Sequence, residues 1–357
     1  MERKNAESGP STCPPPKAPN ASFPTHNSPR VWFMTSALSP LSVRLIRLLL
    51  KHGDYVAAGL PPNEIEDDER CVEFKELIAD CNSNKKQCDD ILMCCTSEAV
   101  VGTVEELSTP VTQNLVRDQF ETIYFTQINF IKAVLPHLRE KRDGHIIILT
   151  GISGHIGTPG MSMFCAATWA LEGFCDSLTY EVAPFNIRVT IVQPNKEISV
   201  LTNKIIFAPQ LPQYESKTNP APVMREILTN VLNTHPDTRI EPQTDQSSKS
   251  TIESRFPILP SESRDKLVME TVHSLTAIGG HENPPARHIV GFEGIAAVKE
   301  KLKTVSEEME DFVEHWERYL IAVAVSRDQT PSMKIEGKGH KIVLQCHMNT
   351  LFCLKYF

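Results

Sequence analysis

Two near-continuous apolar runs constrain the fold of this chain more than any other feature. They are GHIIILT, residues 144–150, and IRVTIVQP, residues 187–194. A strand that is apolar on both faces is typical of a parallel sheet, because helices cover both sides of such a sheet. We therefore expect parallel strands in the interior of the molecule.

Shorter β-prone runs and amphipathic helices surround these two strands. Strands that alternate with helices form βαβ units, which assemble into a doubly wound α/β fold with a parallel sheet. The further strands are expected at residues 31–35, 54–60, 90–95 and 286–291, and the helices at 41–53, 115–141, 162–182 and 266–278.

We expect a single folded domain over residues 31–320. Residues 1–30 are rich in Pro and Ser and predict a disordered leader that lacks the apolar segment of a secretory signal. Residues 234–266 are polar and aperiodic, so a mobile excursion is expected there. The tail, residues 321–357, has no strong pattern, and its structure is left open.

A C-terminal amphipathic helix is expected over residues 292–320. Its apolar residues recur at alternating spacings of three and four, as in a heptad repeat. Such a stripe can pack over the protein's own sheet or against a coiled-coil partner, and we expect the first. The stripe consists of Ile295, Val298, Leu302, Val305, Met309, Phe312 and Trp316.

Charge and hydropathy exclude several classes of function. The net charge of −8 predicts no nucleic-acid partner. The longest apolar runs are too short to span a bilayer, so no membrane partner is expected. Without a secretory signal, a cytoplasmic location follows as the default. The ten cysteines lack paired spacing, and we expect packed thiols rather than disulfides or a metal site.

Three long stretches of the sequence resemble one enzyme family. They cover residues 116–164, 170–194 and 284–302, and they are similar to the short-chain dehydrogenase/reductase family, especially its members similar to 17β-hydroxysteroid dehydrogenases. The resemblance implies a Rossmann-like domain, NAD or NADP as the cofactor, and hydride exchange with a carbonyl or alcohol. The 29 residues 61–89 have room for about one helix, so the third-strand unit is expected to be missing or shortened.

The cofactor turn departs from the family pattern. Where the family has T-G-x-x-x-G-x-G, this chain has TSALSPLS, so Ser36, Pro40 and Ser42 replace the glycines. Glycine lets the chain turn tightly and approach a pyrophosphate, and proline has no N–H for a phosphate. Nucleotide binding is therefore expected to be weakened. The resemblance places the cofactor at Thr35, Ser36, Ser39, Leu41, Cys94, Ser97, Pro194, Asn195 and Ser199.

The catalytic positions of the family are also changed. An Asn, a Ser and a Tyr-x-x-x-Lys pair form its proton relay, in which the tyrosine exchanges the proton that accompanies the hydride. The resemblance places these four groups on Ile123, Gly151, Phe164 and Thr168. None of these residues has an acidic proton, so no catalytic residue is expected here.

Neighbouring side chains offer little to replace the relay. Tyr124 follows Ile123 but points about 100° away from it on a helix. Tyr180 is too far along its helix, and Ser153 is interpreted as a turn-capping hydroxyl. Phe164 and Trp169 are expected to be core or pocket-lining aromatics.

Three interpretations follow from the sequence. The first is an inactive or strongly impaired family member, a pseudoenzyme that acts as a scaffold or binds a small-molecule ligand or partner. The second is an NAD(P)H-dependent oxidoreductase with an unorthodox proton donor. The third is a faulty coding sequence in segment 61–89 and the last residues of the tail. A homo-oligomer that pairs through helices 115–141 and 162–182 is also expected.

Overall fold

The fold was analysed in a computed structural model of the chain. It describes residues 29–60, 91–194, 197–214, 225–228, 252–255, 257 and 260–328, with the backbone alone for residues 255, 261 and 311–328. Most of the expected leader, residues 1–28, lies outside the described residues. The same holds for segment 61–89, where the third-strand unit was expected, for Asn195 and for the tail after residue 328. The chain divides into two compact units, one up to Lys301 and one from Leu302, and each is considered by itself.

The first unit is built on a sheet of six strands in the order β2-β1-β3-β5-β6-β9, and every neighbouring pair is parallel. The expected apolar runs form its centre. The strands are β1 (Val31–Met34), β2 (Tyr55–Ala58), β3 (Ile91–Cys94), β5 (Gly144–Leu149), β6 (Ile187–Pro194) and β9 (Arg287–Val290).

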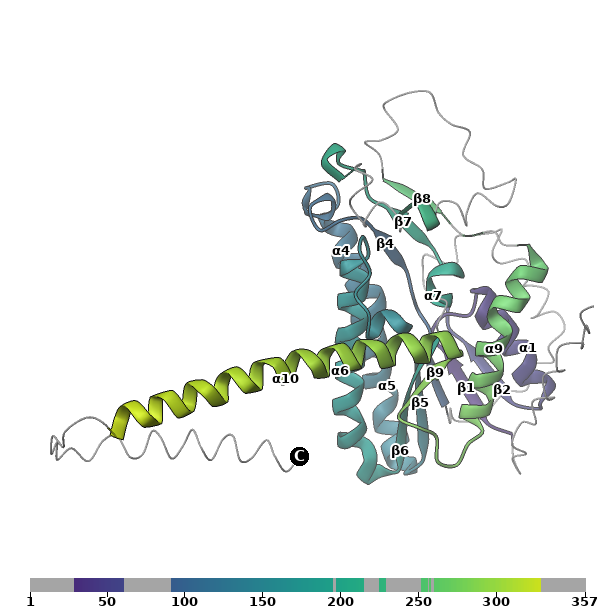
Figure 1. Cartoon of the computed structure of the whole chain (residues 1–357). Helices are drawn as coiled ribbons and strands as arrows, with labels where there is room; N and C mark the ends of the chain where they lie inside the picture. Colours follow the sequence, from purple (N-terminus) through teal and green to yellow (C-terminus); the bar gives the residue numbers. More distant parts are fainter. Residues whose placement is uncertain are drawn as a thin grey trace, which may run out of the picture. The chain divides into compact units, whose positions relative to one another are not determined.

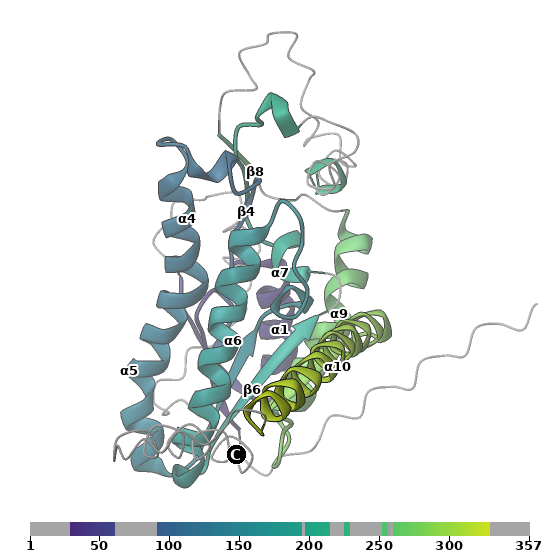
Figure 2. The ribbon, with the colours of Figure 1, turned by 60° about the vertical axis from the view of Figure 1, so that its left-hand side comes forward.

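Helices cover both faces of this sheet, as the doubly wound fold requires (Figures 1 and 2). Successive residues of β5 point to opposite faces, so Ile147 packs in one apolar core while Ile146 and Ile148 pack in the other. The first core contains residues of α1 (Pro40–Lys51) and α9 (Ser261–Gly279), and the second contains residues of α5 (Thr126–Lys141) and α6 (Ser162–Val182).

The helix expected at residues 115–141 is one helical stretch with an irregular centre. It begins as α4 (Gln113–Phe120), passes through a π-helical turn, η2 (Glu121–Phe125), and continues as α5. Single π-turns inside α-helices often occur at functional sites. This turn contains Ile123, one of the four family positions.

A second, small sheet was missed by the sequence analysis. It contains β4 (Ala99–Val101), β7 (Ile205–Phe207) and β8 (Glu253–Arg255), with β4 and β7 parallel and β7 and β8 antiparallel. The prediction of a mobile excursion over residues 234–266 is wrong for the last part of that range, because β8 and the first turn of α9 lie there. A three-residue strand is too short for a periodic pattern, and β8 forms only by pairing with β7.

The remaining helices are short, apart from the last. They are η1 (Glu106–Ser108), η3 (Ile152–Gly154), η4 (Ala183–Phe185), α7 (Ile198–Leu201), η5 (Pro212–Tyr214) and α10 (Phe292–Asp328). The expected helix 292–320 is confirmed and extends to Asp328. Among the described residues, no helix is long and apolar enough to cross a membrane.

We predict that Leu45→Ala lowers the free energy of unfolding by about 2 to 5 kcal/mol, because Leu45 is fully buried in the first core and its loss leaves a cavity. Chemical denaturation measures this change. The matched control is Val111→Ala, at a side chain that is largely exposed, for which a change within about 0.5 kcal/mol is expected. Equal losses for both variants would contradict the assignment of the core.

Candidate functional site

The candidate site lies where the strands of the large sheet end. In open parallel sheets, ligands bind beyond the carboxyl ends of the strands, where the strand order reverses. β1 and β3 lie side by side although β2 comes between them in sequence, so this reversal occurs at their ends. The residues expected at the cofactor follow β1, β3 and β6, and the segment after β5 contains Gly151.

The turn after β1 is closed by its own hydrogen bonds. The hydroxyl of Ser42 donates to the carbonyl oxygen of Ser36 at 2.7 Å, which links two of the former glycine positions. The N–H of Ser42 donates to Oγ of Ser39 at 3.1 Å, as an N-cap of α1. All three residues are buried. The hydroxyl groups of Ser39 and Ser42 are thus used within the turn itself.

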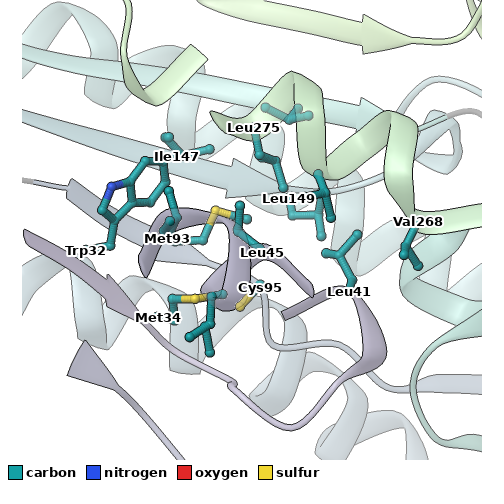
Figure 3. Close-up of a cluster of buried hydrophobic side chains, with 14 of the residues drawn as sticks. Trp32, Met34, Leu41, Leu45, Met93, Cys95, Ile147, Leu149, Val268 and Leu275 are labelled. Carbon is teal, nitrogen blue, oxygen red and sulfur yellow. The ribbon is translucent and has the colours of Figure 1, made fainter. Parts of the chain in front are cut away.

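Apolar packing closes the same turn from outside. Leu38 and Leu41 are buried in the core cluster that contains Ile198 of α7 and Val268 of α9. Figure 3 shows Leu41 gathered with Leu149 and Val268 in this cluster. A pyrophosphate needs close backbone approach at this point, and the residues present do not fit one.

The segment after β3 is tied to the closed turn. Oγ1 of Thr35 accepts from the N–H of Cys95 at 3.0 Å and from the hydroxyl of Thr96 at 2.9 Å. Cys94 instead lies in the core on the other face, where burial raises its pKa well above the ordinary value. Ser97 is partly buried. The four described cysteines, at 94, 95, 165 and 175, are buried thiols.

The expected residues after β6 contribute little to a nucleotide site. Pro194 is the last residue of β6 and pairs with Val290. Ser199 is buried in α7, and its carbonyl oxygen accepts from the side-chain amide of Asn203 at 2.8 Å. Both positions therefore serve the packing around α7.

Two of the family's four relay positions are brought together in an apolar core. Ile123 and Phe164 are 5% and 2% exposed, and they share one cluster with Val200, Phe207 and Leu228. Thr168 is also buried, and its hydroxyl donates to the carbonyl oxygen of Phe164 at 2.9 Å. That bond within α6 occupies the proton that the hydroxyl could offer.

A buried carboxyl group stands at the fourth relay position. A Cβ added to Gly151 would meet the carboxylate of Glu197. The N–H of Ser153 donates to Oε1 of Glu197 at 2.8 Å, and the Ser153 hydroxyl lies 3.3 Å from Oε2. The sequence interpretation of Ser153 as a turn cap is therefore wrong. The carboxylate occupies the space of the family's serine side chain.

The environment of Glu197 favours its neutral form. Burial raises its pKa from 4.5 to about 7, with a further rise from the charge of Glu172, while the hydrogen bonds of Ser153 lower it. The backbone of Glu197 is left-handed, with φ 45° and ψ 48°. Such a conformation costs about 1 kcal/mol or more for a residue other than glycine. The contacts of its side chain offset this cost.

A second carboxylate, that of Glu172 on α6, is held on several sides. It accepts from the hydroxyl of Thr150 at 2.8 Å and from the side-chain amide of Gln193 at 2.8 and 2.9 Å. Arg287 of β9 approaches within 3.4 Å and His155 within 3.9 Å. Burial raises the Glu172 pKa, and these donors and charges oppose the rise. Glu172 therefore ties α6 to the residue after β5, to β6 and to the first residue of β9.

The aromatic side chains differ from expectation at one position. Phe164 is a core aromatic, whereas Trp169 is 49% exposed, so of the two roles expected for these aromatics the core role does not apply to Trp169. Its ring N–H donates to the carbonyl oxygen of Ser153 at 2.7 Å, which holds the ring at the surface. Tyr124 packs against Phe174, away from the relay, and Tyr180 is exposed.

A pocket lined in part by Val101 of β4 has a cavity volume of about 10 Å³, about enough for one water molecule. Its wall includes Glu106, which accepts from the N–H groups of Thr103 at 2.7 Å and Leu211 at 3.0 Å and pairs with Arg225 at 3.3 Å. The carboxylate already has its partners, so it fixes the loops around the small sheet. Within the described residues, no cluster of His, Cys, Asp or Glu could hold a metal ion.

We predict that Glu197→Gln removes a pH dependence of stability. The Glu197 pKa is higher in the folded than in the unfolded state, so its stabilising contribution is full below pH 4.5 and disappears as pH rises to about 7. Unfolding measured across this window should give a wild-type stability that falls relative to the variant. Glu181→Gln, at an exposed side chain, should keep the wild-type profile. Parallel profiles for wild type and Glu197→Gln would contradict the prediction.

We also predict that Gly151→Ser destabilises the fold by about 1 to 3 kcal/mol, because the new side chain and Glu197 compete for one space. The backbone of Gly151 is extended, so any residue can adopt it. Gly157→Ser is the control, since nothing lies within 4 Å of a Cβ there. In a double-mutant cycle, Glu197→Ala should recover most of the loss; no coupling between the two positions would refute the overlap.

The fold and the sequence were compared with known proteins. The family model described as short chain dehydrogenase matches residues 73–204. Human retinol dehydrogenase 8 is 31% identical over 131 residues, which are 37% of this chain and 41% of that protein. Human 17-beta-hydroxysteroid dehydrogenase type 1 is 21% identical over 155 residues, 43% of this chain and 46% of that protein.

A solved structure of a short-chain dehydrogenase from Streptomyces avermitilis has the same fold. Its TM-score is 0.58 at 19% identity, and the alignment covers 81% of this chain and 99% of that one. The sequence matches are shorter, and they span about two fifths of the two human relatives. The matching segment 73–204 contains the positions of all four relay groups.

Proposed function

We propose that this chain, which resembles the short-chain dehydrogenase family over residues 73–204, retains the family scaffold and is catalytically inactive or strongly impaired. Its role is then that of a scaffold, or of a protein that binds a partner or a small molecule at the carboxyl end of the sheet. The apolar cluster that contains Ile123 and Phe164 is the observation that carries this proposal.

The physical argument is the loss of the family's tyrosine and lysine from the relay positions. Hydride exchange with a carbonyl requires a group that gives or takes a proton at the oxygen atom, and a positioned acid accelerates such a step by about 10² to 10⁴. Phe164 has no exchangeable proton, and the hydroxyl of Thr168 is bonded to the backbone. The hydrogen bond between Ser42 and Ser36 in the turn after β1 supports a weakened nucleotide site as well.

The decisive experiment is a nucleotide-binding test on the whole protein. We expect no change in the thermal unfolding of the wild type with NADH or NADPH. A nucleotide present at 100 times its dissociation constant would stabilise the folded state by about 2.7 kcal/mol. A saturable shift with either nucleotide would contradict the closed turn, and steady consumption of the nucleotide with a panel of carbonyl compounds would contradict the proposal itself.

Restoring the relay is the complementary experiment. Phe164→Tyr with Thr168→Lys places an ammonium group at a position that is 3% exposed. We expect this variant to be destabilised, by about 3 kcal/mol or more, rather than activated. Gain of turnover in the variant would show that a substrate pocket and a nucleotide site persist.

Glu197 favours a second candidate function, in which oxidoreductase activity persists with an unorthodox proton donor. Its carboxyl group stands at the position of the family's serine and has a pKa of about 7. A carboxylic acid that is partly protonated near neutral pH can donate to a substrate oxygen. The misfit of the turn to a pyrophosphate counts against this candidate, because a reductant would still be required.

The second candidate makes a different prediction. Any carbonyl reduction by the wild type should decline as pH rises through about 7, because only the protonated acid donates. Glu197→Gln should abolish the activity, while Glu181→Gln should not. Activity that survives in Glu197→Gln would exclude the carboxyl as the donor.

We further propose that the scaffold forms a homo-oligomer through α5 and α6, as is expected from the family. Large apolar side chains are exposed along this side of the first unit. They are Phe125, Trp169 and Tyr180.

A further inference from the structure

The apolar stripe of α10 is not used by the proposed function. From Leu302 onward, the heptad positions a and d are occupied by apolar or aromatic residues through three full repeats. They are Leu302, Val305, Met309, Phe312, Trp316, Tyr319 and Val323. The backbone is helical over this whole range. A seven-residue repeat kept over several heptads favours a left-handed supercoil of two or more helices.

In the described part of this stripe, the two a positions are exposed and Val305, at a d position, is half-buried. Leu302 and Met309 are 59% and 61% exposed, although both stand at a positions. Residues between them on the opposite side of the helix form an i,i+4 ion pair, in which Nζ of Lys303 lies 3.7 Å from Oε1 of Glu307. The helix thus presents one apolar side and one charged side.

The charges of α10 decide what class of partner fits the stripe. Between residues 302 and 328 there are seven acidic residues (307, 308, 310, 311, 314, 317 and 328) and three basic ones (303, 318 and 327), a balance of −4. Such a helix repels nucleic acid and anionic lipid surfaces. With these two classes of partner excluded, the partner that fits is a helix whose apolar residues repeat with the same seven-residue period.

A second copy of the same helix satisfies this requirement. In a parallel pair, each g position faces the next e position of the other helix. These pairs would be Glu308 with Val313, His315 with Leu320, and Ala322 with Arg327, and none of them joins like charges. The acidic residues stand mostly at b, c and f positions, which stay in solvent.

We propose that α10 pairs with α10 of a second copy as a parallel two-stranded coiled coil from Leu302 to Val323. The coil would be about 33 Å long, from 1.5 Å per residue. This pairing is independent of the proposed function of the first unit, because it uses none of the residues at the carboxyl end of the sheet.

The test uses the full chain and measures mass by sedimentation or light scattering at micromolar concentration. Leu302→Glu with Met309→Glu places four charges in the interface of a pair, and we expect the assembly mass to halve. The control is Ala296→Glu with Thr304→Glu, which adds the same charge at exposed b and c positions and should leave the mass unchanged. Thermal unfolding of the first unit should be the same in both variants.

The outcomes separate the possible occupants of the stripe. A monomeric wild type would overturn the proposal, and the stripe would then pack against another part of the same chain. An unchanged mass in the Leu302→Glu, Met309→Glu variant would also overturn it, because pairing would then use another surface. The variant Phe125→Glu with Tyr180→Glu tests α5 and α6 separately.

Mixing experiments test the parallel direction. Position 302 faces position 302 of the other copy in a parallel pair, so Leu302→Glu chains should form dimers again when mixed with Leu302→Lys chains. Mixing Leu302→Glu with Val323→Lys should not restore dimers. The reverse result would overturn the parallel arrangement.

Discussion

Burial of the parallel sheet on both faces is the constraint on which this structure depends. Ile146, Ile147 and Ile148 alternate between two cores, so helices must cover both sides. Only the strand ends then remain for a ligand. Changes at those ends alter function without altering the fold, because the cores that hold the sheet lie elsewhere.

In this chain, the strand ends are occupied by the protein's own groups. Serine hydroxyls close the turn after β1, an apolar cluster holds the positions of the relay, and Glu197 takes the place of a serine side chain. These three changes are compatible with one another, because the closed turn, the filled core and the neutral acid each reduce the need for a bound ligand at the strand ends. The substitutions that remove the family's polar groups thus also add packing contacts at the strand ends.

Glu197 and Glu172 show why part of the site could not be predicted. Glu197 lies three residues after Pro194, its backbone is left-handed, and its carboxylate lies where a Cβ of residue 151 would be. Glu172 meets partners from β5, β6 and β9, which are far apart in sequence. No spacing rule marks either contact. The small sheet could not be predicted for the same reason, because β8 is only three residues long and forms by pairing with β7.

The sequence by itself determined the parallel sheet, its main helices and the loss of the relay, because apolar periodicity and residue chemistry are local properties. It also located the turn that lacks glycine. Only the tertiary structure decided what fills the vacated positions: the Ser36 and Ser42 closure, the core around Phe164, and a carboxyl of raised pKa at Gly151. Those outcomes depend on which distant side chains meet at the strand ends, and that is a property of packing.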